Sequence, residues 1–106
     1  TSTREGIIID FLEQKVPEDW STWKLDNRRM FWEGNINYTG ELVERRKVCA
    51  LEIWCEALMC DPRTIRNSDA AEINSIINGC QGWERQKEPD RFGYCKRQRG
   101  FIKKFQ

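Results

Sequence analysis

The strongest constraint on the fold is one amphipathic segment, residues 48–58, with the sequence VCALEIWCEAL. Its apolar residues recur at spacings of three or four: Val48, Leu51, Trp54, Cys55 and Leu58. Such residues share one face of a helix, whereas Glu52 and Glu56 form an acidic i,i+4 pair on another face. The pattern predicts a helix from residue 48 to about Met59, with Trp54 in the core and the two glutamates solvated or salt-bridged by Arg45 or Lys47.

A second helix and a hairpin are predicted after this segment. Ser68 is a suitable N-cap, and Gly79 is a typical stop signal. The buried face of this helix is expected to consist of Ala70, Ile73, Ile76 and Ile77. Residues 83–87 and 94–104 then predict two strands around a turn that contains Pro89 and Gly93. Helix, turn, helix and hairpin in this order indicate a mainly α domain with a small β-hairpin, similar to a winged helix-turn-helix.

The N-terminal part predicts two further helices. The first is predicted at residues 3–14. Ser2 and Glu5 form its capping box, and Pro17 ends it. Residues 26–33 form the second helix, whose inward side chains are expected to be Met30, Phe31 and Trp32. Residues 41–45 form a short strand with Leu42 and Val43 facing inward. The 106 residues therefore predict one domain, with a helical part at 1–40 and a winged-helix-like part at 41–106. Because the chain begins Thr-Ser-Thr without Met, we expect a C-terminal fragment of a larger protein.

Charge is distributed unevenly along the chain, although the net charge is only +1. Residues 1–60 carry eight Lys/Arg against eleven Asp/Glu, and residues 61–106 carry ten against six. Residues 91–106 contain six basic residues and no acidic one. This end of the chain is therefore the candidate for contact with an anionic partner, unless its cations are merely solvated.

Several chemistries are excluded by composition. The chain has five Cys, no CxxC pair and no His, so the usual zinc sites are excluded and no metal or cofactor is expected. We expect five free thiols, as in a reducing cytoplasm. No apolar run approaches the length of a membrane span. No GxxxxGK[ST] phosphate-binding loop occurs, and the Glu52–Glu56 pair has no His or metal partner, so this domain is not expected to be an enzyme by itself.

Four segments carry a resemblance as a set. They are residues 20–34 (WSTWKLDNRRMFWEG), residues 48–58, residues 68–83 (SDAAEINSIINGCQGW) and the ending Gln98-Arg99-Gly100-Phe101. Together they resemble the C-terminal region of the virulence-associated protein E family, which are ATPases of the primase–helicase type from phages and mobile elements. The resemblance implies a small helical domain appended to a nucleoside-triphosphatase that acts in DNA replication. Catalytic residues cannot be carried over, because the positions that bear them lie outside this chain.

Two functions remain open from the sequence. The second helix carries Asp69 and Glu72 and no cation, so its contact with DNA phosphates would be repulsive. The basic hairpin is the better candidate, since its cations are interleaved with Phe92, Tyr94 and Phe101, although burial of Phe101 is favoured over base stacking. The candidate DNA-binding residues are Arg91, Lys96, Arg97, Arg99, Lys103 and Lys104, extended by Arg63 and Arg66. The alternative is a docking or oligomerisation module that contacts other domains or subunits of the parent ATPase.

Overall fold

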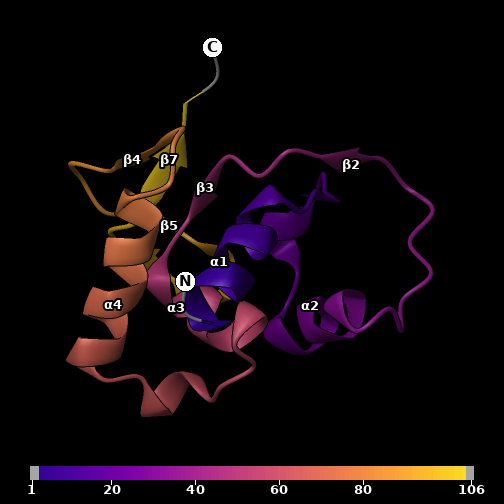
Figure 1. Cartoon of the computed structure of the whole chain (residues 1–106). Helices are drawn as coiled ribbons and strands as arrows, with labels where there is room; N and C mark the ends of the chain where they lie inside the picture. Colours follow the sequence, from indigo (N-terminus) through magenta and orange to yellow (C-terminus); the bar gives the residue numbers. More distant parts are fainter. Residues whose placement is uncertain (1–2, 105–106) are drawn as a thin grey trace.

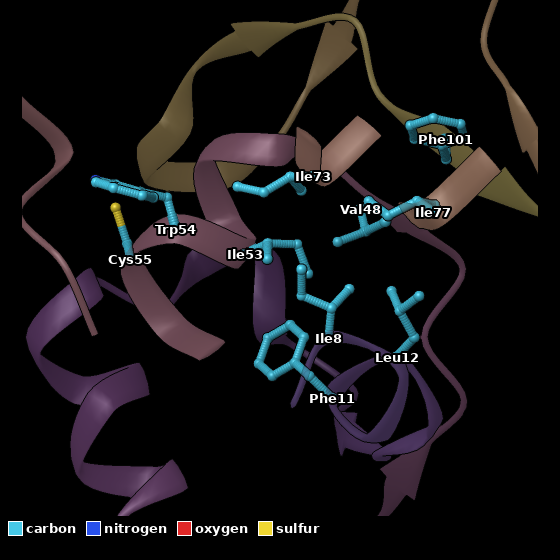
Figure 2. Packing of buried hydrophobic residues seen from close by; sticks show 10 residues of the cluster. All are labelled: Ile8, Phe11, Leu12, Val48, Ile53, Trp54, Cys55, Ile73, Ile77 and Phe101. Atoms are coloured by element: carbon cyan, nitrogen blue, oxygen red, sulfur yellow. The ribbon is translucent and has the colours of Figure 1, made fainter. Parts of the chain in front are cut away.

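Two helices that are far apart in the sequence, α1 (Thr3–Glu13) and α4 (Asn67–Asn78), enclose the core. The structure is a computed structural model that describes residues 3–104. In Figure 1, α4 and α2 (Leu25–Trp32) lie on opposite sides of α1. Figure 2 shows the buried cluster that the elements share: Ile8, Phe11, Leu12, Val48, Ile53, Trp54, Cys55, Ile73, Ile77 and Phe101. Trp54 is 7% exposed, which confirms its predicted place in the core.

Both N-terminal helices are confirmed, with small corrections. A 3-10 turn, η1 (Trp20–Thr22), connects them, and β1 (Val16–Pro17) pairs antiparallel with β2 (Leu42–Val43). Met30 and Leu42, which were expected to face inward, are 44% and 42% exposed. Successive residues of a strand face opposite sides, so β2 turns Val43 inward and leaves Leu42 outside. Ser2, the expected cap, lies outside the described residues.

The segment that dominated the sequence analysis is not one regular α-helix. Lys47–Val48 form strand β3, α3 spans Ala50–Glu52, and a π-helix, η2, spans Ile53–Ala57. The Leu58 amide donates to the Ile53 carbonyl at 3.0 Å, a bond of the i→i+5 type. The wider π-turn changes which residues share a face. Ile53 is fully buried although it lay off the predicted apolar face, whereas Leu51 and Leu58 are only half-buried.

Helix α4 ends as predicted but begins differently. Its N-cap is Arg66, and the Asp69 carboxylate accepts the Arg66 backbone N–H at 3.0 Å, so Ser68 is not the cap. An acidic group in the first turn also interacts favourably with the helix dipole. Arg4 of α1 forms ion pairs with Asp69 and Glu72. The two carboxylates therefore hold α4 against α1.

The C-terminal strands form a hairpin with an elaborate loop. Strand β7 (Phe101–Lys103) lies between β3 and β4 (Trp83–Arg85) in an antiparallel sheet, with Val48 and Arg85 both paired with Phe101. Within the loop, β5 (Asp90–Arg91) pairs with β6 (Arg97–Gln98) around a 3-10 turn, η4 (Gly93–Cys95). The predicted strands 83–87 and 94–104 are thus too long. Gly93 and Lys96, with φ of 59° and 61°, turn the backbone out of the extended conformation.

The described chain is therefore a small domain of helices and short antiparallel sheets. None of its described helices is both long and apolar enough to cross a membrane. All five cysteines lie in the described part and carry free thiols.

Candidate nucleic-acid interface

A concave surface lies where the hairpin loop meets the η1–α2 connection, and we call it the basic groove. It has a volume of about 830 Å³ and is lined by Ser21, Thr22, Trp23, Lys24, Lys47, Arg91, Gly93, Tyr94, Lys96 and Arg97. Five of these residues are basic, and none of the described residues that line the groove is acidic. Strand β5, which supplies Arg91 to the groove, is labelled in Figure 1. Its charge is suited to an anionic ligand.

Arg91 and Arg97 lie directly opposite each other in the β5–β6 ribbon. Both side chains are exposed. Opposed residues of an antiparallel pair have Cβ atoms about 4.5–5.5 Å apart, and like charges at such positions destabilise the ribbon. A phosphate between the two guanidinium groups would remove this repulsion and could accept hydrogen bonds from both. This cross-strand pair is the feature of the groove that points most directly to an anion.

Lys96 enters the groove from an unfavourable backbone conformation. Its φ is 61° and its ψ is −142°, a region that residues other than Gly rarely adopt. Two backbone bonds hold it there: the Lys96 amide donates to Gly93 at 3.0 Å, and the Lys96 carbonyl accepts from Phe92 at 2.8 Å. Glycine would meet the conformational requirement without strain. A lysine at this position suggests that the side chain has a use beyond folding.

Lys47 and Lys24 supply the remaining cations of the groove. The Lys47 ammonium donates to the Arg91 carbonyl at 2.6 Å and to the Asp90 carboxylate at 3.2 Å, and it lies 5.1 Å from the centre of the Phe92 ring. The backbone N–H of Arg91, together with Lys47, lowers the pKa of Asp90. Asp90 is therefore a paired anion. Lys24 is exposed and is the N-cap residue of α2.

A buried charge network lies beneath the groove. The Arg28 guanidinium, with 1% of its side chain exposed, donates to Glu52 at 2.8 Å, to Glu56 at 3.1 Å and to the Trp20 carbonyl at 2.6 Å. The prediction of a solvated acidic face for these two glutamates was wrong, because both are buried around Arg28 and are only 3% and 1% exposed. A salt bridge of Glu52 with Arg45, 3.8 Å away, is confirmed. The principal partner, Arg28, was not foreseen.

The network also joins the hairpin loop to the helical body. The Tyr94 hydroxyl donates to Glu56, as does the Trp32 indole N–H at 3.0 Å. Burial, and then the neighbouring Glu56 carboxylate, raise the pKa of Tyr94, so this hydroxyl keeps its proton. Burial raises the pKa of Glu52 against the opposing effect of Arg45. Burial lowers the pKa of Arg28, but Glu56 and Glu52 outweigh this effect, so the net shift is upward and Arg28 remains charged.

Gly93 lies at the contact between the loop and the body. A Cβ atom at this position would lie 2.8 Å from the Arg28 guanidinium and 2.8 Å from the Ser21 carbonyl oxygen. Phe92 and Cys95, on either side, pack with Cys49 in a second buried cluster. The loop is therefore fixed on the body, and the groove between them is formed before any ligand arrives.

A second hollow, the inner cavity, continues from the basic groove. It has a volume of about 400 Å³ and shares Ser21, Lys47, Arg91 and Gly93 with the groove. Its other charged lining residues are Arg28, Arg45, Arg46, Glu18, Glu44 and Glu52. Arg45 is 3% exposed, lies 4.5 Å from the centre of the Phe11 ring, and has two nitrogens without a hydrogen-bond partner among the described residues. The three arginines and three glutamates that belong to the inner cavity alone balance each other, so the excess of positive charge lies in the basic groove.

The structure brings only part of the predicted DNA-binding set together. Arg91, Lys96 and Arg97 line the groove. Arg99 donates to the Gln86 carbonyl at 2.7 Å, and Lys104 pairs with Glu84 at 3.3 Å. Three further cations also lie elsewhere. The Lys103 ammonium lies over the Trp83 ring, Arg63 forms a salt bridge with Asp61, and Arg66 forms one with Asp69. These last five do not line the groove.

Sequence reasoning missed two cations of the groove, Lys24 and Lys47, and one of its two aromatic residues, Trp23. Lys47 belongs to the basic run 45–47, but no local pattern indicates that this run meets the C-terminal cations. Trp23 and Lys24 are more than 60 residues away from Arg91 in the chain, and only the packing of η1 on η4 brings them near it. Of the aromatics expected in the hairpin, Phe92 is 3% and Phe101 1% exposed, so neither is available for stacking.

No protein-family model matches the chain, and no curated protein matches it either.

Proposed function

We propose that this domain is a non-catalytic accessory domain that binds DNA weakly and with little sequence preference through the basic groove. The observation that carries the proposal is the groove itself, with five cations from three segments of the chain and the opposed pair Arg91 and Arg97. Neutralisation of phosphates by Lys and Arg supplies most of non-specific DNA affinity. The likeness of the segments at 20–34, 48–58, 68–83 and 98–101 to the virulence-associated protein E family supports a parent protein that is a replication ATPase of a phage or mobile element.

A winged-helix architecture belongs to the same proposal. The order of α1, β3, α3–η2, α4, β4 and β7 supports it, as does the position of β7 between β3 and β4. In this scheme residues 86–100 are the wing and α4 is the helix that would face a major groove. Helix α4 contains no Lys or Arg, and Arg4 already holds Asp69 and Glu72. Binding through the wing side of the molecule therefore fits the charges better than binding through α4.

The test is a salt titration of DNA binding with matched charge variants. Three or four phosphate contacts predict a slope of log K against log salt of about −3. The double variant Arg91→Ala/Arg97→Ala should weaken binding to all sequences alike and remove about two contacts from the slope. Arg63→Ala/Arg66→Ala removes the same charge outside the groove and should change the slope much less. Equal effects of the two double variants would contradict the groove as the binding surface.

The second candidate function is a docking module, and a different cavity favours it. This cavity, of about 600 Å³, lies between α1, α4 and β4, and its lining combines the apolar residues Ile9, Leu12, Ile76 and Trp83 with charged residues such as Glu5, Glu13 and Lys103. Apolar surface beside α4 is the feature expected of a protein contact. Replacing Ile76 by Glu should abolish self-association or capture by the parent ATPase core while leaving the salt slope of DNA binding unchanged. Light scattering and the DNA titration together distinguish the two functions.

A further inference from the structure

The shape of the basic groove identifies the form of nucleic acid that suits it. A duplex is normally read by a convex element, such as a helix, that enters a major groove about 12 Å wide. Here the cations line a concavity of about 830 Å³. The helix available for a major groove, α4, carries no cation. A flexible single strand can follow a concave, positively charged path, whereas a stiff duplex cannot.

An aromatic side chain lies among the cations of this path. Trp23 is half-buried and lines the groove next to Lys24. Its indole N–H donates to the Asp19 carboxylate at 2.9 Å. The ring also packs against Trp20, Phe31 and Tyr38 at centroid distances of 5.3, 5.8 and 5.9 Å. Trp23 is therefore a rigid, partly exposed aromatic surface whose orientation is fixed without a ligand.

Aromatic rings within a basic groove are the usual means by which proteins hold unpaired bases. Only unpaired bases offer an open face to such a ring, because the bases of a duplex stack on each other. Tyr94, the other aromatic of the groove, is half-buried, and its hydroxyl is bound to Glu56. The Trp23 indole N–H, by contrast, is bound to exposed Asp19 and not to the buried network.

We propose that the basic groove binds single-stranded DNA in preference to duplex DNA, with one base stacked on Trp23 and neighbouring phosphates on Lys24, Arg91 and Arg97. This inference rests on the proposed function, since it names the form of DNA that the groove accepts. Stacking supplies a contribution that is insensitive to base identity, because every base has a π-face. It also predicts that part of the affinity survives at high salt, where phosphate contacts are weakened.

The test uses the full chain and three labelled ligands of about 12 nucleotides: oligothymidylate, its duplex with oligoadenylate, and an abasic strand with the same phosphates. The parent should bind oligothymidylate at least five-fold more tightly than either of the other two. Trp23→Leu keeps an apolar side chain without a π-face, and it should reduce the affinity for oligothymidylate to the abasic level. Trp23→Phe should retain most of the preference, and Ile102→Ala, which changes an exposed apolar residue outside the groove, should retain all of it.

The outcomes separate the two proposals. If the parent binds none of the ligands at low salt, the proposed function fails. If it binds duplex as tightly as single strand, or the abasic strand as tightly as oligothymidylate, DNA binding stands and the single-strand inference is overturned. These ligand comparisons require no mutation, so they remain decisive if Trp23→Leu unfolds the aromatic cluster.

Discussion

Replacing Arg28 by Met should be among the most destabilising single changes in this domain. Arg28 is 1% exposed and hydrogen-bonds two buried carboxylates and the Trp20 carbonyl. Methionine fills similar space but leaves Glu52 and Glu56 buried without their central cation. Removing one partner of a buried ion pair costs about 3–5 kcal/mol. The guanidinium contacts with the Trp20 and Tyr94 rings, at 4.6 and 4.9 Å, are lost as well.

For a domain of this size the loss corresponds to a fall in melting temperature of roughly 15–25 °C. Thermal and urea unfolding at neutral pH measure it. Arg4→Met is the matched control, because it removes an arginine that pairs with Asp69 and Glu72 at the surface, and it should cost less than about 1 kcal/mol. The penalty of Arg28→Met should shrink as the pH falls, since protonation discharges the stranded carboxylates. An Arg28 variant as stable as the Arg4 variant would refute the assignment of the network.

Three further predictions concern the core, the groove and the thiols. Trp54→Ala should lower the free energy of unfolding in urea by about 3–5 kcal/mol. A variant that melts like the parent would contradict the assignment of Trp54 to the core. Lys96→Gly should raise the free energy of unfolding by about 1 kcal/mol, because glycine adopts the positive φ of this position without strain, and it should weaken DNA binding. A loss of stability, or unchanged DNA binding, would contradict a strained lysine with a role in binding. All five thiols should react under denaturing, non-reducing conditions. In the folded protein Cys55 should react slowly, because burial raises its pKa to about 12, and rapid native labelling of Cys55 would contradict this.

Local patterns predicted the features that depend on local spacing. Helix α1, the end of α4 at Gly79 and the burial of Trp54 follow from apolar periodicity and stop signals within one segment. The π-helix does not, because hydrophobic spacing alone does not reveal an i→i+5 bond. An acidic i,i+4 pair such as Glu52 and Glu56 is typical of a solvated face unless its partner is known.

Arg28, the partner of Glu52 and Glu56, is distant from them in the sequence, and most groove contacts likewise join residues that are far apart in the chain. Arg28 precedes Glu52 by 24 residues, and no local signal connects them. Three of the five groove cations could be predicted, namely Arg91, Lys96 and Arg97, because these cations are close in the chain. The other two, Lys24 and Lys47, depend on long-range packing of η1 and β3 against the hairpin loop. Burial of Phe92 likewise depends on Cys49 and Cys95.

Amide chemical-shift mapping tests the central claim most directly, because it locates the binding surface without any mutation. Addition of a short single-stranded oligonucleotide to the ¹⁵N-labelled domain at low salt should shift the amides of residues 21–24, 47 and 91–97. The amides of α4, residues 67–78, should change little. Shifts concentrated in α4 with the groove unaffected would contradict the account.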